Sequence, residues 1–181
     1  MDNVPDNESR SRESGKPRRS DGMTLIHCSP VKIEKIEKDT GWGYFEDVLF
    51  FATTAYSISQ ASKEYEYHVE CEENEIIRAR ELEEYYESDE FKAAQKDLVR
   101  RYDFIDDDDA YDLISAYKIA YDFDADCEEL ASLSWTIQKI QAQLARAFGF
   151  RFCESRDEQG TVYAGAMFGR ENELELFEED K

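Results

Sequence analysis

The chain lacks the features by which several protein classes are recognised. Its four cysteines, at positions 28, 71, 127 and 153, form no C-x-x-C pair, and no histidine stands at zinc-ligand spacing beside them. We therefore expect no metal site and free, reduced thiols. No apolar run approaches the roughly 20 residues of a membrane-spanning helix, and no charged-then-apolar amino terminus marks a secretion signal. We expect no membrane partner and a cytoplasmic location.

Positive charge is also scarce. The chain has 22 lysines and arginines against 43 aspartates and glutamates, so its formal net charge is -21. Like charges repel and no counterions would be released, so we expect no direct binding to a nucleic-acid backbone. A basic partner, or a protein surface that normally receives DNA, remains open.

The acidic clusters do not form a calcium-binding loop of the EF-hand type. They lie at residues 106–109 and 122–126. An EF-hand loop needs glycine at its sixth position and glutamate at its twelfth. Counting from Asp122, those positions hold Cys127 and Leu133, which makes calcium binding there unexpected.

The 181 residues suit one domain preceded by a tail. Residues 1–22 are rich in Ser, Arg, Asp, Asn and Pro, and their only strongly apolar side chains are Met1 and Val4. Burial of so few apolar side chains cannot offset the conformational entropy that the segment would lose on ordering, so we predict a disordered tail. Five acidic and five basic residues balance within it. The domain over residues 23–181 therefore carries the whole net charge.

Strand and helix patterns alternate along this domain and favour an α+β fold with a split β-sheet. Expected strands cover residues 23–27, 48–51, 65–71, 150–154, 161–168 and, as an edge strand, 174–177. A helix or turn is expected at 31–38, a glycine loop at 41–43, a short helix at 55–62, a helical block at 74–121 and a long helix at 127–148. Gly149 would stop the long helix, and 156–160 would form a polar turn.

The chain has only two histidines, in different settings. His68 alternates with Glu66 and Glu70 on one face of a strand, which predicts a solvated or ion-paired surface side chain. His27 ends the first strand, and taken alone it would be a core histidine.

Two further elements of the sequence suggest that His27 is a functional residue. Ser29 follows His27 closely. The run from Leu49 to Tyr56 consists mainly of aromatic residues and residues with small side chains, and a turn late in the chain holds Asp157 and Glu158. This layout resembles that of ADP-ribosyltransferases.

A narrower resemblance is to phage anti-CRISPR proteins that ADP-ribosylate, and so disable, the type I-F Cascade complex. Its residues are Leu25-Ile26-His27-Cys28-Ser29, Ile33-Glu34-Lys35-Ile36, Trp135, Gly149 and Asp157-Glu158-Gln159-Gly160-Thr161. They cover the first and last thirds of the domain, and the helical block between them is longer here. The resemblance implies an ADP-ribosyltransferase-like split β-sheet with flanking helices and an enlarged helical block, acting in the host bacterial cytoplasm.

The resemblance also implies roles for individual residues, with NAD as co-substrate. His27 and Ser29 would contact NAD, and Asp157 would be the catalytic carboxylate. Glu158 would be the alternative acid or would orient the target side chain. The aromatic residues Phe50, Phe51 and Tyr56 would line the nicotinamide pocket. A fixed carboxylate suits this reaction, because cleavage of the nicotinamide bond builds positive charge on the ribosyl carbon. A histidine can bond the ribose without a permanent cation beside the nicotinamide ring.

Three functions remain open. The first is NAD-dependent mono-ADP-ribosylation of a Cascade subunit, which would block recognition of target DNA. The second is a stoichiometric acidic DNA mimic, whose carboxylates at 106–109 and at 83, 84 and 87 occupy a basic groove. The third is a transferase-like fold that only binds a partner. Each of these residues also has a purely structural interpretation. Asp157 and Glu158 would form an ordinary hairpin turn, one of Phe50 and Phe51 would face the core, and Trp135 would pack on the long helix.

Overall fold

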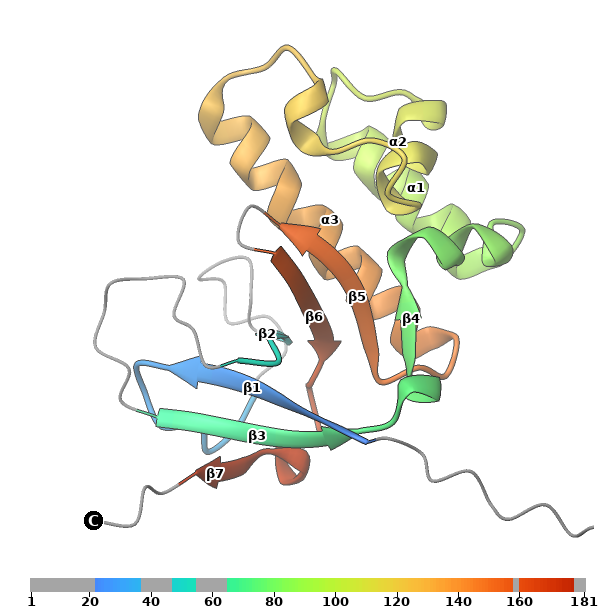
Figure 1. The fold of residues 1–181 in the computed structure, drawn as a ribbon. Coiled ribbons are helices and arrows are strands. Elements are labelled where there is room, and N and C mark those ends of the chain that lie inside the picture. The colour runs from blue at the N-terminus through green and yellow to red at the C-terminus, as the bar shows by residue number, and fades with distance from the viewer. Residues whose placement is uncertain (1–21, 37–46, 55–64, 158–159, 178–181) are drawn as a thin grey trace, which may run out of the picture.

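In the computed structural model the described residues are 22–36, 47–54, 65–157 and 160–177 (Figure 1). The expected tail, the glycine loop at 41–43 and the short helix at 55–62 lie outside them, apart from Gly22 at the end of the tail. The strands are β1 (Met23–Ser29), β2 (Val48–Phe51), β3 (Tyr65–Cys71), β4 (Ile76–Arg78), β5 (Phe152–Asp157), β6 (Gly160–Ala166) and β7 (Glu175–Phe177). The helices are α1 (Asp89–Arg101), α2 (Asp107–Ile114) and α3 (Cys127–Ala147), with short 3₁₀ turns η1 (Glu73–Glu75), η2 (Ala79–Tyr85), η3 (Ala120–Asp122) and η4 (Glu171–Glu173).

The strands form two sheets, which confirms the mixed α+β prediction. One sheet has the order β1-β3-β7 and is antiparallel, and the other has the order β2-β6-β5-β4, with β4 parallel to β5. A bridge between Ile26 and Ala52 joins them through two backbone hydrogen bonds of 2.8 and 3.0 Å. Because β1 and β2 meet at this bridge, residues just beyond it on each strand are brought together.

An apolar layer holds the two sheets against each other. Leu25 of β1 and Val69 of β3 are buried against Phe51 and Phe152 of the four-stranded sheet. The rings of Phe51 and Phe152 meet edge to face at 5.2 Å between centroids, although β6 runs between their strands. The Phe152 ring can cross β6 because Gly165 has no Cβ, and a Cβ there would lie 2.8 Å from that ring.

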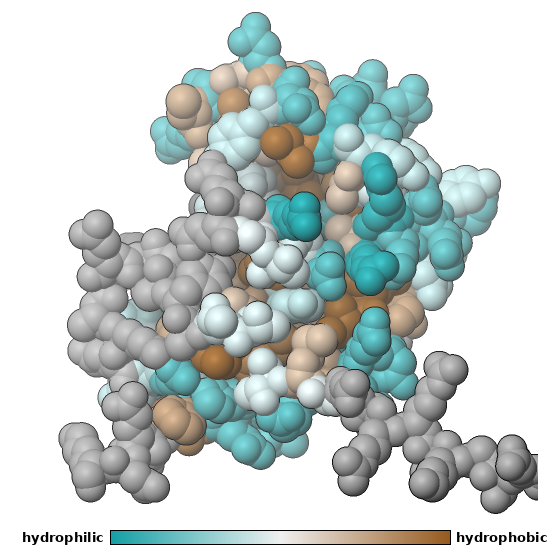
Figure 2. All heavy atoms as spheres, viewed as in Figure 1, coloured by the Kyte–Doolittle hydropathy of each residue, from teal (hydrophilic) through white to brown (hydrophobic). Residues whose placement is uncertain are grey.

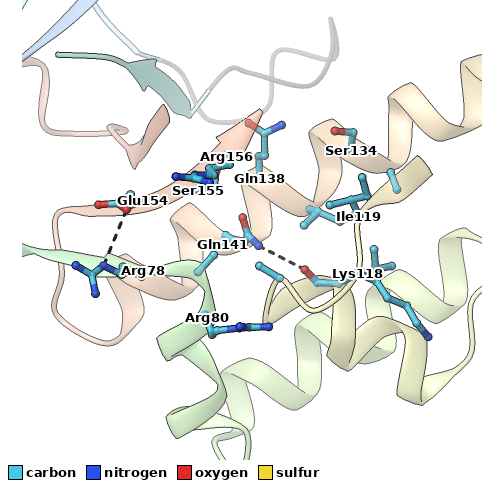
Figure 3. A pocket seen from close by; sticks show the side chains of 15 residues that line it. Arg78, Arg80, Lys118, Ile119, Ser134, Gln138, Gln141, Glu154, Ser155 and Arg156 are labelled. Carbon is cyan, nitrogen blue, oxygen red and sulfur yellow. Dashed lines mark hydrogen bonds and ion pairs between the residues drawn. The ribbon is translucent and has the colours of Figure 1, made fainter. Parts of the chain in front are cut away.

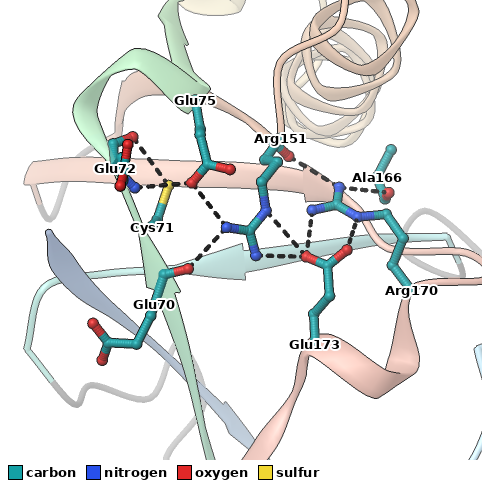
Figure 4. A network of polar contacts seen from close by, with 8 residues as sticks. All are labelled: Glu70, Cys71, Glu72, Glu75, Arg151, Ala166, Arg170 and Glu173. Atoms are coloured by element: carbon teal, nitrogen blue, oxygen red, sulfur yellow. Dashed lines mark hydrogen bonds and ion pairs between the residues drawn. The ribbon is translucent and has the colours of Figure 1, made fainter.

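A polar network closes one edge of this layer (Figure 4). Arg151, just before β5, bonds Glu75 at 2.9 Å and Glu173 at 2.6 Å, and Arg170 bonds Glu173 at 2.7 and 2.8 Å. The hydrogen bond from Arg170, reinforced by Arg151, lowers the pKa of Glu173 to about 2. The network ties η1, β5 and η4 together, although they are far apart in the sequence.

Helix α3 covers the other face of the four-stranded sheet (Figure 1). It begins at the N-cap Asp126, whose carboxylate accepts the backbone N–H groups of Glu128 and Glu129, and these bonds satisfy two donors that a helix start leaves free. Its buried stripe includes Leu133, Ile137, Ile140 and Leu144. It ends at Phe148, and Gly149 follows at φ +92°, as predicted.

The segment at 74–121 is less helical than we predicted. It contains α1 and α2, but near its start, after η1, lies β4, a strand that pairs with β5. Three residues are too few to show a two-residue period, so the strand is invisible in the sequence. Residues 31–38 are predicted as a helix or a turn, and the described part, to Ile36, contains bends and no helix, which agrees with the turn.

Candidate functional site

The imidazole of His27 is held at the junction of the two sheets. Its Nδ1 lies 2.8 Å from the carbonyl oxygen of Phe50, and its ring centroid lies 5.6 Å from that of Phe51. A carbonyl can only accept, so Nδ1 carries the hydrogen and Nε2 of the neutral ring is an acceptor. Burial lowers the pKa of His27, and the hydrogen bond to Phe50 opposes this only in part. The side chain is therefore neutral at pH 7.

Ser29 lies two residues farther along β1, on the same face as His27. It is buried, and its hydroxyl donates to the carbonyl of Val31 at 2.6 Å and accepts the N–H of Val31 at 3.3 Å. The structure therefore gives Ser29 a local role, which is to shape the turn after β1. The predicted contact with NAD stays a prediction.

Phe50 and Phe51 point to opposite faces of the four-stranded sheet. Phe51 is 0% exposed and packs between His27 and Phe152, so one of the pair faces the inter-sheet core, as expected. The Phe50 ring lies 5.6 Å from that of Trp135 on α3, so this tryptophan packs from the long helix as predicted. Phe51 thus packs against His27 on the inter-sheet face, whereas the Phe50 ring lies on the face that α3 covers. Tyr56, the third predicted wall residue, lies outside the described residues.

β5 and β6 form an antiparallel hairpin, as predicted, but its strands extend into the turn predicted at 156–160: Arg156 pairs with Thr161, and residues 158–159 lie outside the described residues. Asp157 ends β5 and pairs through its backbone with Gly160, which has φ +132°. This conformation suits glycine. The Asp157 side chain and the whole of Glu158 lie outside the described part of the structure.

Among the described residues, the backbone of Asp157 does not contact His27. Phe51 and Glu154 both pair with Tyr163, so they are level with each other on either side of β6, and Asp157 lies three residues farther along. Strand spacing and rise per residue then separate the backbones of Phe51 and Asp157 by roughly 14 Å. A ligand that contacts both ends must be extended, as a dinucleotide is.

His68 confirms its predicted surface role. Its Nε2 lies 2.7 Å from Oε1 of Glu66, and its ring stacks on Phe177 at 4.6 Å between centroids. These contacts hold the edge strand β7 and leave His27 as the histidine of the candidate site.

Sequence reasoning missed a cavity of about 310 Å³ on the face of the sheet that α3 covers (Figure 3). The residues that line it come from β4, β5, α2, α3 and the segments around η2 and η3. They are Arg78, Ala79, Arg80, Leu113, Ala116, Lys118, Ile119, Ala120, Ser134, Ile137, Gln138, Gln141, Glu154, Ser155 and Arg156. The only signal in the sequence is the presence of several arginines in an acidic chain, and they are scattered over 79 positions from Arg78 to Arg156.

The described residues contain no metal-binding cluster and no membrane-spanning helix. Within these ranges, no group of three histidines, cysteines, aspartates or glutamates lies close enough together to hold a metal ion. None of the helices described is long and apolar enough to cross a bilayer. All four cysteines are free, and burial raises the pKa of Cys71 to about 12 and also raises that of Cys153. These two buried thiols stay protonated at neutral pH.

Among solved structures, the chain is similar to an anti-CRISPR protein, at low sequence identity. No family model matches the chain, and no curated protein sequence matches it. A crystal structure of an anti-CRISPR protein is 19% identical to this chain and covers 86% of it, or 96% of the neighbour, with a TM-score of 0.48. A likeness of this extent assigns no role to any residue here.

Proposed function

We propose that the chain is an NAD-dependent mono-ADP-ribosyltransferase that modifies a subunit of a type I-F Cascade complex and acts as an anti-CRISPR protein. The reaction comes from the sequence resemblance. The observation that carries the proposal is the state of His27, a neutral imidazole fixed by the Phe50 carbonyl where the two sheets meet.

His27 would bind the ribose of NAD. Its Nε2 acceptor can take a hydrogen bond from a ribose hydroxyl, and the bond from Nδ1 to Phe50 holds the ring in the tautomer that this requires. A neutral ring places no second positive charge beside the nicotinamide cation. The buried Phe51 fixes the ring from the core side.

The acidic hairpin would supply the carboxylate. As the nicotinamide bond breaks, positive charge develops on the ribosyl carbon, and a fixed carboxylate stabilises that charge more than it stabilises bound NAD. Asp157 is our first candidate, and Glu158 is the alternative. Because Asp157 lies on β5, which is separated from β2 by β6, NAD would extend from the sheet junction toward the hairpin.

The negative charge and the size of an added ADP-ribose would prevent Cascade from binding its target DNA. An ADP-ribose on a residue that reads DNA adds two negative charges, which repel the phosphates of the target. Because each enzyme molecule would modify many targets, inhibition would need less than one inhibitor per Cascade.

One observation favours a second function, the stoichiometric DNA mimic. Residues 103–129 contain eleven aspartates and glutamates and a single basic residue, Lys118. Figure 2 shows hydrophilic side chains along the outer edge of the helical part. Asp106, Asp107 and Asp108, at the start of α2, are exposed. Such a surface can occupy a basic groove, and it can equally dock an enzyme on a basic target.

The deciding experiment is the intact mass of Cascade subunits after incubation with catalytic amounts of this protein, with and without NAD. We expect one added ADP-ribose that requires NAD. Asp157→Ala should abolish the addition and His27→Gln should reduce it strongly. Asp124→Ala and His68→Gln, which change the same residue types elsewhere, should leave it intact.

The opposite outcome is equally clear. Unmodified subunits, together with loss of DNA binding only at one inhibitor per Cascade, would refute the transferase. In that case Asp107→Lys should relieve the inhibition, and Asp157→Ala should have no effect.

A further inference from the structure

We propose that three tyrosines in the helical part, Tyr86, Tyr111 and Tyr117, form a docking site for an arginine-rich protein surface of the kind that normally receives a nucleic acid. We call these three residues the tyrosine surface. They lie in the part of the chain that holds α1 and α2, at the opposite end from the β1-β3-β7 sheet that carries His27 (Figure 1). The inference rests on the proposed function only where it takes Cascade as the target.

The tyrosine surface is open to solvent although it is made of aromatic rings. Tyr86 is 50% exposed and Tyr117 is 46% exposed. Among the described residues, seven large apolar or aromatic side chains are exposed, and four of them lie between positions 86 and 121. Apolar side chains scattered singly are ordinary on a protein surface, whereas a group of rings in contact is typical of an interaction site.

One face of η2 contributes to this surface. Residues three apart lie on the same side of a 3₁₀ helix, and Arg80, Glu83 and Tyr86 have this spacing. The guanidinium carbon of Arg80 lies 4.2 Å from the ring centroid of Tyr117, and the hydroxyl of Tyr117 donates to the carboxylate of Glu83. The ring of Tyr86 meets that of Tyr111 edge to face at 6.5 Å between centroids. The surface is therefore continuous from η2 to α2 and the segment after it.

The rings are held in place before any partner binds. Tyr111 and Tyr117 are stacked with 6.4 Å between their centroids, and the fully buried Phe91 of α1 packs against Tyr111 at 5.9 Å. The hydroxyl of Tyr86 donates to Glu87, and this hydrogen bond raises the pKa of Tyr86. Side chains that are already fixed lose little conformational freedom on binding, so an interface built on them has a lower entropic cost.

Carboxylates surround the tyrosine surface. Glu84 is exposed on η2, and Asp107 and Asp108 are exposed at the start of α2. The two aspartates precede Tyr111 by four and three positions, which places them beside it on the surface of the helix. Lys118, the basic residue closest in sequence to the stacked pair, is bonded at 2.8 Å to a carboxylate of α2. The surface is thus aromatic at its centre and negative at its rim.

This combination favours arginine in the partner. A guanidinium can stack on an aromatic ring and can pair with a carboxylate through two parallel hydrogen bonds, whereas an ammonium is a strongly hydrated point charge. The chain itself contains an example, because Arg80 lies over the ring of Tyr117 beside Glu83. The half-exposed ring of Tyr86 remains accessible to a partner. A nucleic acid would be repelled by the net charge of -21, so the partner is a protein.

The first test uses synthetic peptides and needs neither Cascade nor NAD. An arginine-rich peptide and a lysine-rich peptide of equal length and charge are titrated into the full chain by calorimetry. We expect the arginine peptide to bind several-fold more tightly. Tyr86→Ala should weaken its binding about tenfold, and Tyr86→Phe, which keeps the ring, should have a much smaller effect. Phe168→Ala, which removes an exposed ring elsewhere, should change nothing.

The second test connects the surface with the proposed target. Binding of the full chain to Cascade is measured without NAD, at increasing salt concentration and with target DNA already bound to Cascade. We expect Tyr86→Ala and Glu84→Gln to weaken binding, Glu84→Gln to lower its salt dependence as well, and bound DNA to block it. Glu175→Gln, exposed on β7, is the matched control for charge. Thermal unfolding should show every variant folded.

The outcomes separate this proposal from the transferase. Equal affinity for the two peptides would overturn it, because charge alone would then attract them. Arginine-peptide binding that Tyr86→Ala leaves unchanged would also overturn it, as would normal binding of Cascade by that variant. Peptide binding that depends on Tyr86 in a chain that does not bind Cascade would support the surface and refute Cascade as its target. Cascade that is bound through Tyr86 but stays unmodified in the presence of NAD would refute the transferase and support the surface.

Discussion

The two faces of the four-stranded sheet are packed in different ways. The face toward β1 and β3 is dense and aromatic, with Phe51 and Phe152 fully buried. The face toward α3 also has a large apolar core, yet it leaves a cavity between the ends of β4 and β5. The same strands therefore have a dry layer that keeps His27 neutral on one face and a cavity beside the helix on the other.

The difference follows from what covers each face. A second sheet follows the twist of the first and packs against it over a broad area. A single helix covers the strands beneath it, and the space at its side must be filled by neighbouring segments. We expect the inter-sheet face to contribute most to stability, and substitutions on the two faces test that expectation.

The largest effect should come from Phe152→Ala on the inter-sheet face. The ring is 0% exposed and contacts Phe51 across Gly165, so its removal leaves a cavity that the sheets cannot fill. We expect a loss of about 3–5 kcal/mol in the free energy of unfolding, measured by urea denaturation. Phe168→Ala removes the same ring at a position that is 39% exposed, and a loss as large there would contradict our ranking.

Glu173→Gln should have the next largest effect, and that effect should depend on pH. It removes the charge that accepts bonds from Arg151 and Arg170, so we expect a loss of about 2 kcal/mol at pH 7. The pKa of Glu173 is lowered from 4.5 to about 2 on folding, so its contribution is present above pH 4.5 and disappears as the pH falls toward 2.

The measurement is the stability difference between wild type and Glu173→Gln across that pH window. We expect the difference to shrink steadily from pH 4.5 toward pH 2. Glu175→Gln, an exposed neighbour, should show almost no difference at any pH. A gap that persists unchanged at pH 2 would mean that the carboxylate charge is not what stabilises the network.

On the helix face, Asp126→Ala should cost about 1 kcal/mol. The Asp126 carboxylate accepts two backbone N–H groups at the start of α3, and alanine leaves both without that partner. Asp124→Ala removes an exposed carboxylate outside the helix and should change stability by much less. Equal losses in thermal unfolding would attribute the effect to net charge and not to capping.

The smallest effect, and the only gain, should come from Ala116→Gly in the cavity wall. Ala116 has φ +53°, a left-handed conformation that costs an L-residue roughly 1–2 kcal/mol. Glycine relieves this strain but has more freedom when unfolded, so we expect a net gain of about 0.5 kcal/mol. Ala94→Gly, inside α1, should have the opposite sign, and a loss at both positions would show that Ala116 is not strained.

Most of the fold could be predicted because its patterns are local. The strands at Val48–Phe51 and Tyr65–Cys71 have the predicted bounds, and the long helix ends at the predicted glycine. β4 could not be predicted, because three residues show no period and its partner β5 is 76 positions farther along. Whether the two sheets form an ADP-ribosyltransferase-like fold stays a prediction.

The candidate site was predictable only in part. His27 could be selected by its position at the end of a strand, but its bond to the Phe50 carbonyl depends on a bridge between two sheets. The cavity could not be found, because the segments that line it come together only after β4 aligns with β5. Contacts between distant segments carry the chemistry here, and no local pattern in the sequence encodes them.

The crossing of Phe152 over Gly165 also limits how this sequence can change. A methyl group at position 165 would meet the ring at 2.8 Å, and loss of the ring would leave a gap above a residue that has no side chain. Neither position can change alone without a cost to packing. Related chains should therefore keep the pair of large aromatic and glycine, or exchange it for a smaller residue at 152 with a larger one at 165.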